Sequence, residues 1–225
     1  MMLYPDFTRM ADVIPEGKEG CAKISHLQVT AEASDMTRMR AVLKGDFDQI
    51  VREGSYVQLH VKGRLMMSDT QMEQQSNRTF IQHAKGDVLI AGLGVGLILL
   101  PILPREEVTS VTVIEKYPDV IRLVEPHVRK AAGSHAAKLT VIEANIFEWK
   151  PLRGSRYDRI YFDIWPNVCT DNLDQINRLH RKFGRYCKGQ MVSWMQDKLR
   201  RRRRKEKKER KTWVGWSRVL REEPE

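Results

Sequence analysis

Along the chain, apolar runs typical of buried strands alternate with segments that have the hydrophobic spacing of helices, and this order predicts the fold. From residue 86 onward, apolar and β-branched runs recur about every twenty residues, separated by segments with helical spacing. The runs are "DVLIAG", "SVTVIEK", "KLTVIEANIFEW", "YDRIYFDIWP" and "GQMVSWM". This alternation is typical of a parallel sheet covered on both faces. We therefore expect an α/β fold, a Rossmann-like, doubly wound and mostly parallel sheet.

The N-terminal third follows a different pattern. Residues 1–20 contain prolines and glycines with weak periodicity, which predicts a loose leader. A strand at 23–33, a short helix from an N-cap at Ser34 to a stop at Gly45, a hairpin around Lys62-Gly63 and a helix over 71–84 should follow. In that last helix, one side should hold Met72, Gln75, Ser76, Thr79, Phe80 and His83.

These patterns divide the chain into three expected parts. Residues 1–70 form a leader, short helix and β-hairpin region, 71–196 the Rossmann-like domain, and 197–225 a basic C-terminal helix and tail. The apolar run 88–103 is too short for a membrane span, and no signal-peptide pattern is present. A cytoplasmic protein without membrane association is expected. Three scattered cysteines and six histidines lack the spacing of a metal site.

The net charge of +10 is concentrated in one segment. Residues 197–211 hold eleven Lys/Arg and three acids, a net +8, which leaves +2 for the rest. A helix with this charge density could bind a nucleic-acid backbone through residues 198–211. It could equally be a solvated helix, with Glu206 and Arg210 as a favourable i,i+4 pair. No N-P-P-Y-like motif of base methyltransferases is present.

Three glycines follow the first strand of the regular region. Gly92, Gly94 and Gly96 lie at the carboxyl end of a strand, where doubly wound sheets bind ligands. The spacing is GxGxG, and Leu97 stands where the dinucleotide fingerprint has its third glycine. Glu115, at the end of the second strand, can accept the hydroxyls of an adenosine ribose. Together they favour an adenosine cofactor without a pyrophosphate, S-adenosylmethionine, over a ligand-free packing turn.

In order and spacing, these segments resemble the class I S-adenosylmethionine-dependent methyltransferase fold over residues 56–196. Within it they look most similar to the spermidine synthase branch and guanidinoacetate N-methyltransferase. The resemblance implies that the three glycines border the methionine and ribose of the cofactor, and that Glu115 binds the ribose hydroxyls. It places Asn145, where the family usually has Asp, at the adenine amine and Ile146 against the ring.

The same resemblance implies a reactive end at "FDIWPN". Asp163 would bind the attacking nitrogen and accept its proton, and Pro166 matches the methyltransferase pattern. Trp165 stands where the aminopropyl-transferring enzymes have a second Asp, which counts against that activity. Glu73 should supply a second, substrate-binding carboxylate, with Asp69 as the alternate. The alternatives without a function in catalysis are a capping role for Asp163, a solvated helix face for Glu73 and a core position for Trp165.

The resulting hypothesis is a methyltransferase acting on a nitrogen of a small amine or guanidino compound. Aminopropyl transfer is the alternative chemistry, and a non-catalytic protein binding S-adenosylmethionine or nucleic acid is the alternative class. The relatives often dimerise. After the fifth strand only "TWVGWSRVL" remains to extend the sheet, so the sheet is either shortened or completed by a partner subunit in a homodimer.

Overall fold

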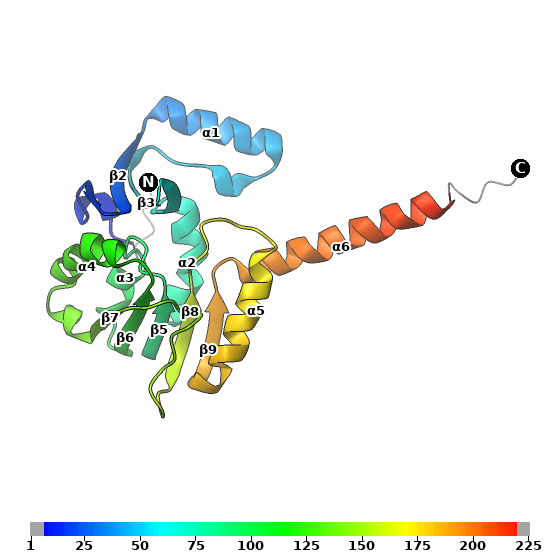
Figure 1. The fold of residues 1–225 in the computed structure, drawn as a ribbon. Helices are drawn as coiled ribbons and strands as arrows, with labels where there is room; N and C mark the ends of the chain where they lie inside the picture. Colours follow the sequence, from blue (N-terminus) through cyan, green and yellow to red (C-terminus); the bar gives the residue numbers. More distant parts are fainter. Residues whose placement is uncertain (1–6, 220–225) are drawn as a thin grey trace, which may run out of the picture.

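A five-stranded parallel sheet forms the centre of the protein (Figure 1). The computed structural model describes residues 7–219, without the side chains of Asp48 and 210–219. The strands are β5 (Gly86–Ala91), β6 (Val108–Glu115), β7 (Leu139–Glu143), β8 (Tyr157–Phe162) and β9 (Cys187–Ser193). Their order is β7-β6-β5-β8-β9, and all neighbours are parallel. The strand order reverses beside β5, which confirms the predicted Rossmann-like, doubly wound fold class.

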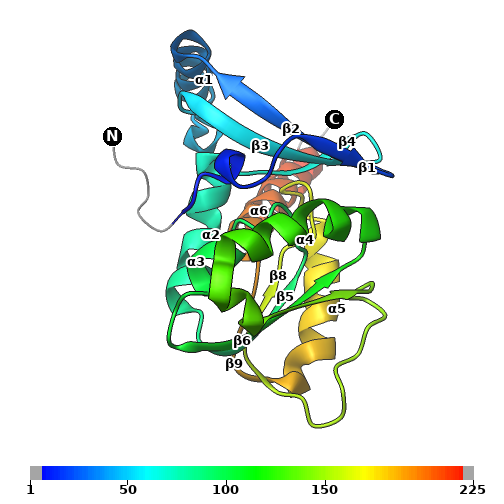
Figure 2. The same ribbon diagram turned by 90° about the vertical axis from the view of Figure 1, so that its left-hand side faces the viewer.

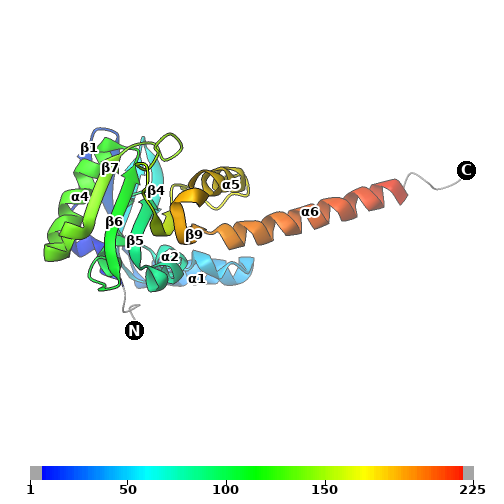
Figure 3. The ribbon, with the colours of Figure 1, turned by 90° about the horizontal axis from the view of Figure 1, so that it is seen from below.

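Helices cover both faces of this sheet. They are α2 (Gln71–His83), α3 (Leu99–Ile102), α4 (Pro118–Ala132) and α5 (Asn172–Phe183). Successive residues of β5 point to opposite faces: Val88 and Ile90 pack on the side of α2 and α4, Leu89 and Ala91 on the side of α5. The view from below shows α4 and α5 on opposite sides of the sheet (Figure 3). Burial on both faces explains the continuous apolar runs in the sequence.

A second, antiparallel sheet lies over the α2 and α4 side (Figure 2). It consists of β1 (Gly17–Glu19), β2 (Ala22–Val29), β3 (Gly54–Val61) and β4 (Arg64–Ser68), paired in that order. The predicted hairpin turn is confirmed, with positive φ at both Lys62 and Gly63. Ile24 and Val57 belong to the same apolar cluster as Val88 and Ile90. The two sheets therefore share one core.

The predicted loose leader is wrong for the described residues after 6. Met10 and Ile14 are fully buried, and Gly17–Glu19 pairs with β2. The antiparallel sheet supplies an apolar surface that a local sequence pattern does not reveal. Short 3-10 turns occur at Met10–Asp12, Phe47–Gln49, Gly133–Lys138 and Gly184–Tyr186.

Two helix predictions need correction. Helix α1 (Ala31–Lys44) begins after Thr30, whose hydroxyl accepts a hydrogen bond from the Ala33 N–H at 3.2 Å. Ser34 is therefore a buried residue inside α1 and not its N-cap, whereas the stop at Gly45 is confirmed by a φ of +63°. In α2 the buried side chains are Glu73, Asn77, Phe80 and Ile81. The buried face of α2 therefore differs from the predicted one, because two polar side chains, Glu73 and Asn77, point inward.

Helix α6 (Gln196–Val219) extends away from the rest of the molecule (Figure 1). Leu199 is fully buried at its base, and Arg203 pairs with Asp174 of α5 at 3.1 Å. Residues 213–219 continue this helix, so within the described chain β9 remains at the sheet edge. The predicted Glu206–Arg210 pair lies outside the described side chains. None of the helices in the described part has the length and apolar character that a membrane span needs.

Candidate active site

The glycine turn after β5 brings three segments into contact. Gly92 has a φ of +100°, and a Cβ there would collide with the carbonyl oxygen of Asp163 in the loop after β8. Gly94 has a φ of +54°, and a Cβ there would collide with the Met67 sulfur of β4. Glycine is required at both positions because left-handed backbone and close packing coincide. The turn therefore holds β5, β8 and the antiparallel sheet together.

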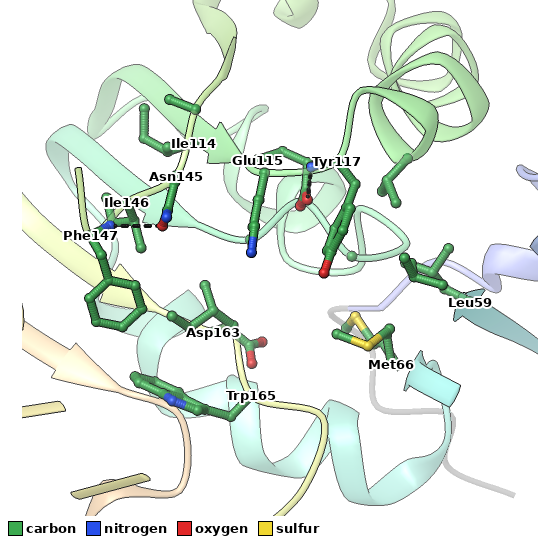
Figure 4. A pocket seen from close by; sticks show the side chains of 18 of the residues that line it. Leu59, Met66, Ile114, Glu115, Tyr117, Asn145, Ile146, Phe147, Asp163 and Trp165 are labelled. Atoms are coloured by element: carbon green, nitrogen blue, oxygen red, sulfur yellow. Dashed lines mark hydrogen bonds between the residues drawn. The ribbon is translucent and has the colours of Figure 1, made fainter. Parts of the chain in front are cut away.

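A cavity of about 250 Å³ lies beside this turn (Figure 4). Its walls come from both sheets and from the loops at the carboxyl ends of β5, β6, β7 and β8. The lining residues include Gly92, Gly94, Glu115, Lys116, Tyr117, Asn145, Ile146, Phe147, Glu73, Asp163, Ile164, Trp165, Gln175, Leu59, Val61, Met66 and Met67. This is the position at which a doubly wound sheet binds its ligand. Gly96 lies outside this lining and packs against Val128 of α4.

Glu115 links the glycine turn to the start of α4. One carboxylate oxygen accepts a hydrogen bond from the Leu93 N–H and the other from the Tyr117 N–H, both at 2.9 Å. Burial raises the pKa of Glu115, while these backbone donors act in the opposite direction. A carboxylate offers about four acceptor positions, so positions remain for hydroxyl groups in the cavity.

Asn145, Ile146 and Phe147 form the wall after β7. The Asn145 side-chain oxygen accepts a hydrogen bond from the Phe147 N–H at 3.1 Å, and its amide nitrogen donates to Glu148 at 2.9 Å. These bonds fix the turn, and the oxygen keeps one acceptor position. Ile146 is buried, and Phe147 adds an aromatic ring to the same wall.

Glu73 of α2 and Asp163 after β8 bring two carboxylates to the same cavity. Only 8% of Glu73 is exposed, so a solvated helix face is excluded. Burial, followed by the negative charge of Asp163, raises the pKa of Glu73 to about 8. Burial raises the pKa of Asp163 to about 7. Near neutral pH such a pair retains a proton, and a bound cation would favour its fully charged form.

A frame of hydrogen bonds holds the α2 end of this pair. The Asn77 amide donates to the Glu73 carbonyl at 2.9 Å, and the Tyr161 hydroxyl donates to the Asn77 side-chain oxygen at 2.7 Å. On the other side of Glu73, the Trp194 indole N–H donates to the Ser76 hydroxyl at 2.9 Å. It also bonds to the Glu73 carboxylate, which lowers the pKa of Glu73. These polar partners explain why α2 presents Glu73 and Asn77 inward.

Of the remaining predicted residues, Trp165 lines the cavity, whereas Pro166 and Asp69 do not. Trp165 lines the cavity with 7% exposure, and its indole N–H donates to Gln175 at 2.8 Å, so it is both core and wall. Pro166 is absent from the lining. Asp69 is buried elsewhere: its oxygens accept hydrogen bonds from the Met10 and Val57 N–H groups. Asp69 thus ties the leader to the antiparallel sheet, outside the cavity.

Sequence reasoning missed the apolar side of the cavity. Leu59 and Val61 of β3 and Met66 and Met67 of β4 line it from the antiparallel sheet. Tyr117 was also missed, and its hydroxyl points into the same space as the Asp163 carboxylate (Figure 4). Tyr117 follows Glu115 by two residues, so the sequence could have suggested that it lies near the cavity. The sequence of the hairpin does not indicate that the hairpin packs against the cavity.

Comparisons with known proteins give only distant structural likenesses. No protein-family model matches the chain, and no curated protein matches it. Among solved structures, the CcbJ methyltransferase from Streptomyces caelestis shares 18% identity over 52% of this chain and 47% of its own, with a TM-score of 0.41. A spermidine synthase in complex with the transition-state analogue AdoDATO shares 16% over 61% of this chain and 50% of its own, at 0.43. The N-methyltransferase NodS from Bradyrhizobium japonicum shares 16% over 53% of this chain and 64% of its own, at 0.40. The chain therefore spans less than two thirds of each of these structures.

Proposed function

We propose that this protein is an S-adenosylmethionine-dependent N-methyltransferase whose acceptor is a small cationic amine. The observation that carries the proposal is the pair of carboxylates in the cavity beside the glycine turn, of which Glu73 is buried and Asp163 is partly buried. Two like charges in a shared, poorly solvated site are unfavourable unless a proton or a cation joins them. An ammonium group is the small organic cation that suits such a pair.

The other half of the cavity suits the adenosine cofactor. Gly92 and Gly94 expose backbone to the cavity where a side chain would have no room, and Glu115 keeps free acceptor positions for ribose hydroxyls. Ile146 and Phe147 offer an apolar surface for a purine ring. When bound, S-adenosylmethionine supplies a methyl group already activated by the sulfonium charge. The protein then has to position the acceptor and remove a proton.

The carboxylate pair can perform both tasks. As an ammonium acceptor binds, its charge favours the ionised form of Glu73 and Asp163. One of these carboxylates then accepts the proton that the nitrogen must lose to expose its lone pair. We assign proton acceptance to Asp163, because its loop directly contacts the glycine turn. We assign binding of the cation to Glu73.

The apolar side of the cavity limits which amines can serve as the acceptor. Leu59, Val61, Met66 and Met67 face the same space, so the body of the amine should be hydrocarbon. A guanidino group could also bind two carboxylates and remains within the proposal. Aminopropyl transfer is the alternative chemistry, because a carboxylate pair also binds polyamines. Trp165 in the cavity wall, where that reaction would use a second Asp, is the observation against it.

Helix α6 favours a second candidate function, contact with nucleic acid. Its residues 197–209 contain nine Lys/Arg and three acids, a net +6, on a helix that projects from the body. If this arm binds RNA or DNA, its affinity should fall steeply with salt. Loss of binding on replacing Arg201 and Arg204 by Gln would support this contact. Salt-independent binding, or no binding, would reject it.

Calorimetric titration tests the proposed cofactor. The purified protein is titrated with S-adenosylmethionine, its decarboxylated form and NAD, alongside Glu115→Gln and the exposed control Glu143→Gln. We expect S-adenosylmethionine to bind most tightly, Glu115→Gln to weaken it at least tenfold, and Glu143→Gln to leave it unchanged. Tighter binding of the decarboxylated form would indicate aminopropyl transfer as the activity, in place of the proposed methylation. Absence of binding by all three would refute the proposal.

A further inference from the structure

A second pocket, of about 360 Å³, lies on the antiparallel sheet and shares no lining residue with the candidate active site. It is formed by β1, β2, β3 and the turns after β1 and β3. Its lining residues are Lys18, Cys21, Ala22, Lys23, His60 and Gly63. Among the described residues, this lining contains three basic side chains and no acid. A pocket of this composition suits an anion.

The strand register places the three basic side chains in one row. Lys18 of β1 lies directly opposite Lys23 of β2, and Lys23 lies directly opposite His60 of β3. Residues in such positions share one face of the sheet, with Cβ atoms about 4.5–5.5 Å apart. The row therefore brings three groups within reach of one small ligand. Because two lysines directly opposite each other destabilise a sheet, an anion between them would be stabilising.

The row lies on the face of the antiparallel sheet that points away from the parallel sheet (Figure 2). Leu59 and Val61, the neighbours of His60 along β3, line the candidate active site. Since successive side chains of a strand point to opposite faces, His60 points away from that site. Lys23 shares the face of His60 because the two residues are directly paired. The pocket and the candidate active site therefore lie on opposite faces of β3.

The basic side chains of this row have no partner in the part of the chain that the structure describes. Lys18, Lys23 and His60 make no side-chain hydrogen bond or ion pair there. The Nδ1 atom of His60 is even buried without a hydrogen-bond partner. Polar groups this close to the protein interior normally have partners, so their absence here is a reason to expect a ligand.

Two acids near the pocket are engaged on the other side of the sheet. Glu19, next to Lys18 in β1, pairs with Arg122 of α4 at 3.0 Å. Asp119 of α4 accepts a hydrogen bond from the Cys21 N–H at 2.8 Å and also pairs with Arg122. Because side chains alternate along β1, Glu19 points toward α4 and Lys18 points to the opposite face. These carboxylates therefore leave the basic row without a direct counter-charge.

We propose that this pocket binds the phosphate group of a small molecule through the ammonium groups of Lys18 and Lys23 and the imidazole of His60. A phosphate group offers several oxygens to these donors, and hydrogen bonds between charged partners are the strong ones. The row ends at the edge strand β1 on one side and at the apolar Leu65 of β4 on the other. It is therefore too short to follow a nucleic-acid backbone. This inference does not depend on the proposed enzymatic function.

Calorimetric titration of the full chain with inorganic phosphate and with pyrophosphate, from about 10 µM to 10 mM at constant ionic strength, tests the pocket. We expect both anions to bind, and Lys23→Gln to weaken their binding at least fivefold. The matched control is Lys85→Gln, since Lys85 is also an exposed lysine but lies outside the pocket. This control should bind like the parent protein. Absence of binding at the highest concentration, or equal binding by Lys23→Gln, would overturn the proposal.

Nuclear magnetic resonance of the histidine rings tests where the anion binds. With ¹⁵N-labelled histidine, pyrophosphate should shift the ring signals of His60, which His60→Phe assigns, and leave those of His180 unchanged. Shifts at other histidines without a shift at His60 would place the anion elsewhere and contradict the proposal.

Two larger phosphate-bearing probes distinguish the source of the phosphate group. A single-stranded oligonucleotide and vesicles containing phosphatidic acid are compared with pyrophosphate, each with the parent protein and Lys23→Gln. We expect neither probe to lose affinity in Lys23→Gln. If either binds more tightly than pyrophosphate and loses that affinity in Lys23→Gln, nucleic acid or a lipid headgroup would replace the small molecule. Lys23 is exposed, so folding should be unaffected.

Discussion

Replacing Glu73 by Gln should stabilise the ligand-free protein at alkaline pH and have little effect in acid. Glutamine keeps the shape of glutamate and can still accept the indole N–H of Trp194, but it cannot ionise. In the parent protein, burial and the neighbouring Asp163 raise the pKa of Glu73 from 4.5 to about 8. Folding therefore becomes less favourable as Glu73 loses its proton.

The direction of the effect follows from proton binding. Below pH 4.5 the carboxyl is protonated in both the folded and the unfolded chain and contributes no difference. Between 4.5 and about 8 the folded protein retains a proton that the unfolded chain has released, so the free energy of unfolding falls with rising pH. The gap between these two pKa values corresponds to about 5 kcal/mol at most. By pH 8 on the order of 4 kcal/mol should be lost, and at pH 5 less than about 1 kcal/mol.

Thermal unfolding measured at pH 5 and at pH 8 provides the assay. For a chain of this length, about 4 kcal/mol corresponds to a midpoint difference on the order of 10 °C. Glu73→Gln should unfold at a correspondingly higher temperature than the parent protein at pH 8, and at nearly the same temperature at pH 5. The control Glu143→Gln, at an exposed position, should follow the parent protein at both values. An equal difference between Glu73→Gln and the parent at both pH values would refute the reasoning.

Two further substitutions test the frame around the carboxylates. Gly92→Ala should destabilise the fold by about 2–4 kcal/mol in urea unfolding, because the new Cβ meets the Asp163 carbonyl oxygen and the backbone has positive φ; a loss below about 1 kcal/mol would mean that the turn yields easily. Trp194→Phe removes the indole N–H that Ser76 and Glu73 accept, so it should raise the pKa of Glu73; the loss of stability with rising pH should still begin near pH 4.5 but continue to a higher pH and become larger in total. An unchanged pH profile of the thermal midpoint would show that Trp194 only fills space.

Most of the central sheet could be predicted from the sequence. Its strands are buried on both faces, so each appears as a continuous apolar run. The positions of Glu115 and Asp163 follow from the same reasoning, because both come at the carboxyl ends of such strands and those ends meet at one edge. The glycine turn was also recognisable, although its glycines are needed for contacts with Asp163, Met67 and Val128 within the protein itself.

What could not be predicted depends on contacts between distant segments. Met10 and Ile14 are buried by a sheet that forms largely later in the chain, so their local sequence resembles a loop. The phase of α2 was misjudged because its inward face carries Glu73 and Asn77, where an amphipathic pattern would place apolar residues. Asp69 and Glu73 are both buried acids four residues apart, and only the structure separates them. Asp69 bonds to backbone N–H groups, whereas Glu73 faces the cavity.

Transfer of a labelled methyl group from S-adenosylmethionine to amines tests the central claim most directly. The panel should include alkylamines, polyamines and guanidino compounds, with the parent protein and Asp163→Asn compared at equal concentration. We predict label on the nitrogen of an amine with a hydrocarbon body, and a loss of at least 100-fold in Asp163→Asn while its affinity for S-adenosylmethionine is retained. Full transfer activity in Asp163→Asn, or no transfer to any amine by a protein that binds the cofactor, would contradict the account.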